Sequence, residues 1–214
     1  NSDQVAKWLG AELYITDTRP IQLQEMILVK HADGHYNLED KMGIVVRQVE
    51  LPVDWPLGSD SDLSAWLTYE VVKQGCSVLM FCGTKNSCQT EAKRLARLMN
   101  APERSMHNSN SGGGGQSGNE SQQMMMPLDR ATLIQELERL LGGGGGLTDP
   151  ELPSMVSKGI AYHHAGLTAE ERELIEQGYK SGALSVLCAT STLAAGVNLP
   201  ARRVVFKHAW VGRS

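Results

Sequence analysis

Short, continuously apolar segments alternate with amphipathic helical patterns in this chain, and this alternation constrains the fold more than any other feature. The apolar segments are "SVLMFC", "GIAYHH", "LSVLCA" and "RRVVF", and the helical patterns between them include "NSCQTEAKRLARLMN" and "TAEERELIEQGYKSG". Apolar runs bounded by glycine are typical of strands that are buried on both faces of a parallel sheet. Alternating strands and helices therefore predict an α/β fold, with a parallel sheet and helices on both of its faces.

The first 50 residues follow a different pattern, which predicts a connector with a β-rich extension. Asp3 is placed to cap a short helix that ends at Gly10, and the extended runs "IQLQEMILVKH" and "GIVVRQVEL" flank the turn-rich segment 32–43. We expect these two runs to form a β-hairpin or an edge extension. Residues 51–214 are then predicted to form one α/β domain.

Two stretches of low complexity interrupt this second domain. Residues 101–127 are dominated by serine, asparagine, glycine and glutamine, and a glycine run occupies residues 142–146. Such polar, glycine-rich sequence does not bury enough apolar surface to offset the entropy of ordering it. We therefore predict a disordered insertion over 101–127, whether natural or engineered.

Composition excludes several classes of protein. The formal net charge of −4 excludes a globally polycationic nucleic-acid binder but permits a local basic groove. The four cysteines lack the paired spacing of a zinc site, so we expect them to be reduced and structural, with no metal bound. No leader and no apolar run of about 20 residues is present, so we expect a soluble, intracellular protein without a membrane partner.

Ligands of parallel α/β sheets gather at the carboxyl ends of the strands, and three loops at such ends carry unusual residues. The first loop is "CGTKNS", in which Gly83 permits close backbone approach, a helix begins, and Lys85 adds positive charge. This combination suits a phosphate group, although the spacing is not that of a P-loop. A plain strand-to-helix turn remains the alternative for this loop.

The second loop is "YHHAGLTAEERE", in which Thr168 and Glu171 form the sequence pattern of a capping box. His163 and His164 are adjacent on a strand and are therefore expected to point to opposite faces, which is a poor arrangement for sharing a metal ion. We predict one core or supporting histidine beside one that lies near a phosphate.

The third loop, "TSTLAAGVNLPARR", places hydroxyl groups at Thr190 and Ser191, removes a side chain at Gly196 and offers an amide at Asn198. Hydroxyl groups, backbone N–H groups and a glycine together suit a sugar-phosphate chain. Arg202 and Arg203 add positive charge next to the loop. Spacing alone leaves two alternatives open, contact with a nucleotide or nucleic acid and a plain loop.

Taken together, these segments resemble the second RecA-like domain of superfamily 2 DNA helicases of the Ski-like branch, and within it the group formed by the helicase domain of DNA polymerase theta and its helicase relatives. "TSTLAAGVNLPARR" is similar to motif V of this group, "HHAGLT" to motif IVa, "VLMFCGTKNSC" to motif IV, and "AELYITDTRPIQLQE" to the segment that follows motif III. The resemblance covers most of the chain outside the low-complexity insertion.

The resemblance implies an ATP-driven motor that moves on single-stranded DNA between two RecA-like lobes. By position in the motifs, Gly196 and Asn198 would face the nucleotide cleft. The residues implied to lie along or just behind the DNA path are Thr84, Lys85, His164, Gly166, Arg172, Thr190 and Ser191.

The chain has no Walker A loop, no acidic DExH-type box and no motif VI. We therefore expect it to be one lobe of a larger ATPase, with no catalytic residue and no cofactor of its own. In the full-length protein the resemblance implies ATP and Mg²⁺, the first RecA-like lobe as a partner, a nuclear location and a role in double-strand break end joining. The alternatives are a polymerase-free helicase acting at stalled forks and a non-enzymatic α/β module that binds nucleotide or DNA.

Overall fold

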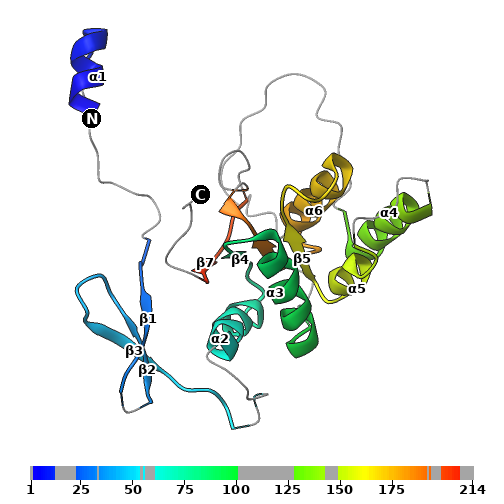
Figure 1. The fold of residues 1–214 in the computed structure, drawn as a ribbon, viewed down its shortest axis with the longest axis horizontal. Coiled ribbons are helices and arrows are strands. Elements are labelled where there is room, and N and C mark those ends of the chain that lie inside the picture. The colour runs from blue at the N-terminus through cyan, green and yellow to red at the C-terminus, as the bar shows by residue number, and fades with distance from the viewer. Residues whose placement is uncertain are drawn as a thin grey trace, which may run out of the picture. The chain divides into compact units, whose positions relative to one another are not determined.

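The computed structural model describes residues 2–12, 23–32, 34–53, 55, 61–100, 128–142, 149–191, 193 and 199–207. The chain forms two compact units, Asn1–Pro52 and Val53–Ser214 (Figure 1). The predicted division into domains at residues 50 and 51 stays a prediction. The predicted insertion at 101–127 and residues 143–146 of the glycine run lie outside the described residues.

The first unit begins with helix α1 (Ser2–Leu9), which ends at Gly10 in a left-handed conformation with φ of 63°. The end of this helix is as predicted, because glycine adopts positive φ without a steric penalty. The prediction that Asp3 caps the helix is wrong, since α1 already starts at Ser2. Asp3 therefore lies in the first turn of α1.

The rest of the first unit is a three-stranded antiparallel sheet in the order β1-β2-β3. Its strands are β1 (Ile27–Lys30), β2 (Tyr36–Glu39) and β3 (Val45–Val49). The segment predicted to be only a turn thus contains the central strand β2. Gly34 and Gly43, both with positive φ, make separate turns on either side of it, and Leu38 is buried between its neighbours.

The second unit has a four-stranded parallel sheet, as the sequence predicted, and its strands lie in the order β5-β6-β4-β7. The strands are β4 (Val78–Phe81), β5 (Ile160–His163), β6 (Val186–Ala189) and β7 (Arg203–Phe206). The helices are α2 (Ser61–Val72), α3 (Lys85–Leu98), α4 (Arg130–Gly142), α5 (Leu152–Ser157) and α6 (Ala169–Ser181).

Helices lie on both faces of this sheet, which gives the RecA-like arrangement expected. The connection from β4 to β5 crosses the sheet in one direction, and the connection from β5 to β6 returns in the other. Because such crossovers are right-handed, α3 and α6 lie on opposite faces. On the face of α3, that helix packs against β5 and β6, while α2 packs against β4 and β7.

Helix α5 was not predicted from the sequence. Its start is fixed by Asp149, whose carboxylate accepts a hydrogen bond from the Glu151 N–H at 2.9 Å, and Pro153 occupies its first turn. An aspartate just before a helix with proline in the first turn is a recognisable start signal, but the helix is only six residues long and lacks a measurable apolar period.

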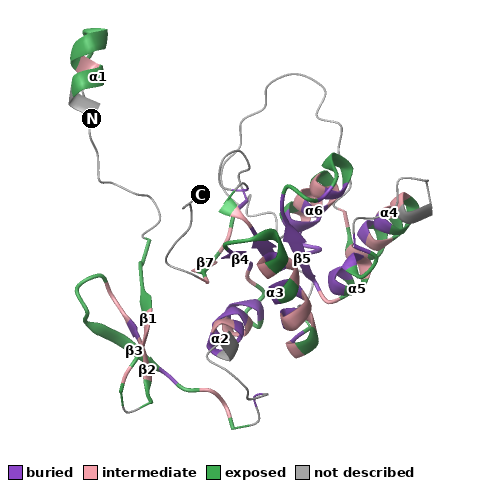
Figure 2. Cartoon of the chain, in the orientation of Figure 1, coloured by how far each residue is buried: buried purple, intermediate pink, exposed green. Residues whose placement is uncertain are grey.

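The core of the second unit lies between the sheet and its helices, and Figure 2 shows β5 almost wholly buried. Strands β4, β5 and β6 are buried at every position, whereas β7 alternates between half-buried and exposed residues. Of the helices that the structure describes, none has the length and apolar character needed to cross a membrane.

Candidate functional site

The carboxyl ends of the four parallel strands lie level with one another. Phe81 of β4 pairs with Ala189 of β6 and with Phe206 of β7, and His163 of β5 pairs with the same Ala189. The loops that follow these strands therefore start side by side along one edge of the sheet. The three loops singled out in the sequence are brought together here, because strand order and register place them at neighbouring positions.

The loop after β4 leads into the first turn of α3. Thr84 is the N-cap residue: its hydroxyl accepts from the Ser87 N–H at 3.1 Å, and the Ser87 hydroxyl accepts from the Thr84 N–H at 3.0 Å. The Thr84 hydroxyl is therefore used in capping α3. The first turn of α3 carries no acidic residue, and Lys85 is exposed within it. A helix start with a lysine and without acidic residues is favourable for an anion.

The loop after β5 is held by His164, which is buried. Its Nδ1 accepts a hydrogen bond from the Gly166 N–H at 3.0 Å, and its ring stacks on Tyr162 with centroids 5.0 Å apart. Because Nδ1 accepts, the neutral ring carries its proton on Nε2. Burial lowers the pKa of His164, which favours this neutral form.

Gly166 joins this loop to the start of α3. A Cβ added at Gly166 would lie 3.0 Å from the His164 ring and 3.6 Å from Cδ of Lys85. The aliphatic part of Lys85 therefore lies beside Gly166, and a side chain at position 166 would crowd the His164 ring while reaching only ordinary van der Waals distance from Lys85. The sequence suggested both residues separately, but only the structure shows that they are in contact.

His163 points to the opposite face, as the strand alternation predicted. Its Nε2 is 2.8 Å from Oε1 of Glu176 on α6, and burial is the main cause of its lowered pKa. His163 thus ties the end of β5 to α6, whereas His164 faces α3. The two histidines do not share a site.

The start of α6 differs from that of α3 in its charge. Thr168 and Glu171 form the predicted capping box, with the Thr168 N–H donating to Glu171 at 2.6 Å. Glu170 adds a second carboxylate to this turn, which disfavours an anion there. Arg172 partly offsets these charges, and its Nε donates to the Thr168 carbonyl at 3.3 Å.

The loop after β6 is described only in part. The Thr190 N–H donates to the His163 carbonyl at 3.3 Å, so this donor continues the sheet and is not free for a ligand. Ser191 is exposed at the start of the loop. Gly196 and Asn198, predicted to face a nucleotide, lie outside the described residues.

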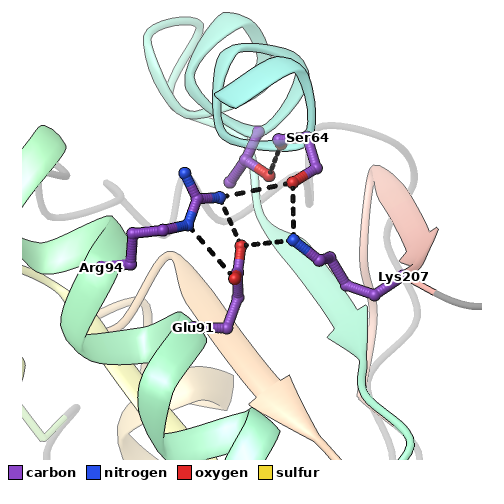
Figure 3. Close-up of polar contacts among 5 residues, drawn as sticks. Ser64, Glu91, Arg94 and Lys207 are labelled. Atoms are coloured by element: carbon purple, nitrogen blue, oxygen red, sulfur yellow. Dashed lines mark hydrogen bonds and ion pairs between the residues drawn. The ribbon is translucent and has the colours of Figure 1, made fainter. Parts of the chain in front are cut away.

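A charged cluster that the sequence analysis missed lies near the same edge of the sheet (Figure 3). Glu91 of α3 accepts from Arg94 through both carboxylate oxygens and is 3.2 Å from Nζ of Lys207, the residue after β7. Arg94 and Lys207 also donate to the hydroxyl of Ser64 on α2, at 3.4 and 3.2 Å. The spacing of three residues between Glu91 and Arg94 is visible in the sequence. Their partners Ser64 and Lys207 come from distant segments, and the sequence does not show that they lie nearby.

Arg203 of β7 also belongs to the packing of the lobe. Its guanidinium donates to the Leu67 carbonyl of α2 and lies 3.5 Å from Glu70. We counted this arginine in the sequence as charge available to the third loop. The structure directs it to α2 instead, because Arg203 and Lys207 project from β7 toward the face that α2 covers.

Comparison with known proteins matches residues 150–210 to the family "Helicase conserved C-terminal domain". The chain is 37% identical over 212 residues to DNA polymerase theta of Drosophila melanogaster, covering 99% of this chain and 10% of that protein. It is 37% identical over 207 residues to DNA polymerase theta of Mus musculus, covering 97% of this chain and 8% of that protein. It is 32% identical over 219 residues to "Helicase POLQ-like" of Drosophila melanogaster, covering all of this chain and 19% of that protein.

Proposed function

We propose that this chain, whose residues 150–210 match a helicase C-terminal domain, is a lobe of a superfamily 2 helicase that binds the backbone of single-stranded DNA along the carboxyl edge of its parallel sheet. The observation that carries the proposal is the contact between two of the predicted loops, with Lys85 at the start of α3 lying beside Gly166. A lysine beside a helix start without acidic residues favours a phosphate group.

The roles of the individual residues follow from their contacts. Lys85 supplies the charge for a phosphate, and backbone N–H groups of the first turn of α3 are its nearest donors. Thr190 and Ser191 contribute hydroxyl groups, and Arg172 lies near the start of the neighbouring helix α6. Thr84, His164 and Gly166 hold the two loops in shape, because their polar groups bond within the loops.

The chain spans about a tenth of the polymerase theta relatives and about a fifth of the "Helicase POLQ-like" relative, so the activity of the whole protein is a proposal. We propose an ATP-dependent DNA helicase of the polymerase theta type that acts in the nucleus in double-strand break end joining. The first RecA-like lobe of the same protein would be the partner of this one.

The described residues hold no grouping of three or more histidine, cysteine, aspartate or glutamate side chains suited to a metal ion. On the resemblance, ATP and Mg²⁺ would be held chiefly by the first lobe, with Gly196 and Asn198 forming the facing wall. We therefore expect the 214-residue chain alone to show no ATPase activity, and DNA-stimulated ATP turnover by the purified chain would contradict this division of roles.

The test of DNA contact uses the 214-residue chain and a fluorescein-labelled oligodeoxythymidine, with affinity measured by anisotropy at several salt concentrations. Lys85→Ala should lower the affinity and reduce the slope of log affinity against log salt by about 1, as expected for one lost phosphate contact. Thr190→Val should lower the affinity about tenfold if its hydroxyl donates to a phosphate.

Lys180→Ala is the matched control. Lys180 is exposed in the last turn of α6, at the opposite edge of the sheet, so its substitution removes the same charge without touching the proposed site. Equal losses for Lys85→Ala and Lys180→Ala would show that binding follows bulk charge and would overturn the proposal.

A further inference from the structure

The cluster of Ser64, Glu91, Arg94 and Lys207 joins the two halves of the second unit. Helix α2 covers β4 and β7, and helix α3 covers β5 and β6. Figure 3 shows the four polar groups closing a ring between these helices, with Ser64 from α2, Glu91 and Arg94 from α3, and Lys207 from the end of β7. The cluster therefore sets where α3 lies relative to α2 and β7.

The charges in the cluster make Glu91 its centre. One carboxylate is paired with two cations, and the side chains of Glu91, Lys207 and Arg94 are only 9%, 16% and 21% exposed. Charge-assisted hydrogen bonds in such a weakly solvated place are stronger than at the surface and have defined geometry. Lys207 reaches α3 through Glu91, so the end of β7 is tied to that helix.

The same helix carries the proposed DNA contact in its first turn. Lys85 lies six residues before Glu91, within one continuous helix of 14 residues. Because an α-helix of this length moves as a rigid rod, a sideways shift at Glu91 also moves Lys85 relative to Gly166 and Thr190.

We propose that Lys207 is a positioning residue for DNA binding, which acts through Glu91 to hold the first turn of α3 in register with the neighbouring loops. This inference rests on the proposed function, since it concerns the same DNA-binding edge. It assigns Lys207 no contact with DNA.

Arg203 provides a matched control on the same strand. It carries the same charge and also ties β7 to α2, through Leu67 and Glu70, but none of its described contacts reaches α3. Lys207→Met and Arg203→Met therefore remove equal charge and similar packing. Of the two, only Lys207→Met removes a described contact with α3, the ion pair with Glu91.

The experiment measures anisotropy of the labelled oligodeoxythymidine with the 214-residue chain, together with thermal unfolding of each variant. Lys207→Met should lower affinity about three- to thirtyfold, the range for residues that act through a packed network. Arg203→Met should leave the affinity at the wild-type value within experimental error, and Lys207→Arg should restore most of the affinity because a guanidinium also reaches Glu91.

A double-mutant cycle separates positioning from direct contact. If Lys207 acts through the first turn of α3, Lys207→Met should cost little further affinity in the Lys85→Ala background. Additive losses, with a salt slope reduced by about 1 for Lys207→Met, would show a direct phosphate contact and overturn the inference. Equal losses for Lys207→Met and Arg203→Met would also overturn it.

Ser64→Ala serves as a second variant, because it loosens the α2 side of the cluster without changing charge. Like Lys207→Met, it should lower the affinity for the oligonucleotide, by about twofold, and an unchanged affinity would contradict the inference. A wild-type chain that does not bind the oligonucleotide would instead refute the proposed function. Binding that depends on Lys85 but not on Lys207 refutes only the positioning role.

Discussion

Gly178 of α6 lies against Leu133 of α4, and its substitution tests how those two helices pack. A Cβ at this position would lie 2.5 Å from Cδ2 of Leu133 on α4 and 3.4 Å from Cδ1 of Leu184. Both leucines are completely buried, so the side chains that would have to shift lie inside the core.

Two opposing terms decide the effect of Gly178→Ala. Alanine is favoured over glycine in a helix interior by about 1 kcal/mol. Overpacking a buried contact costs about 1–3 kcal/mol. The free energy of unfolding of Gly178→Ala should therefore be about 0–2 kcal/mol lower than that of the wild type, although alanine is the better helix former.

The clash can be removed on the other side of the contact. Leu133→Ala alone should lower the free energy of unfolding by about 2–5 kcal/mol, because it leaves a cavity. In that background Gly178→Ala should raise the free energy of unfolding by about 1 kcal/mol, since only the helix preference remains. Urea denaturation of the four proteins measures the cycle, and 1 kcal/mol corresponds to about 2–4 °C in melting temperature for a chain of this size. If Gly178→Ala stabilises both backgrounds equally, the packing of α6 on α4 through Gly178 is wrong.

Three further predictions concern charge and thiols. Burial keeps His163 and His164 neutral with lowered pKa values, whereas the unfolded chain binds protons near pH 6.5, so urea midpoints should be highest above that pH and fall on acidification below it. His164→Asn should flatten this dependence, and midpoints that rise on acidification would contradict it. Ellman's reagent should modify Cys76 alone in the folded protein and all four thiols after unfolding, because the other three are buried; a second fast thiol would refute this. Glu91→Gln removes the charge that pairs with both Arg94 and Lys207 and should cost about 3 kcal/mol in urea denaturation, at least twice the cost of Lys207→Met; equal costs would contradict the central role of the carboxylate.

Local sequence was sufficient to predict much of the second unit. The capping box of Thr168 and Glu171, the helix that starts at Lys85 and the opposite orientations of His163 and His164 were all read from neighbouring residues. Each depends on contacts within a turn of helix or along one strand, where chain geometry leaves few alternatives.

Local reasoning failed where pairing between segments decides the structure. Strand β2 has a polar sequence with one buried side chain, Leu38, and it exists because β1 and β3 supply partners on both sides. Segment 32–43 therefore has turn residues at both ends and a strand between them. Its glycines were recognised, but the strand between them was not.

The assembly of the candidate site also depends on tertiary structure. The order β5-β6-β4-β7 brings together loops that are far apart in the chain, and it places Lys85 beside Gly166. Lys207 meets Ser64 across 143 residues, a pairing that no periodicity signals. Sequence alone determined which residues could bind a phosphate, because that depends on side-chain chemistry and local turns. Tertiary structure decided which of them lie together and which cations are used in packing, because strand order and long-range contacts depend on the free energy of the whole fold.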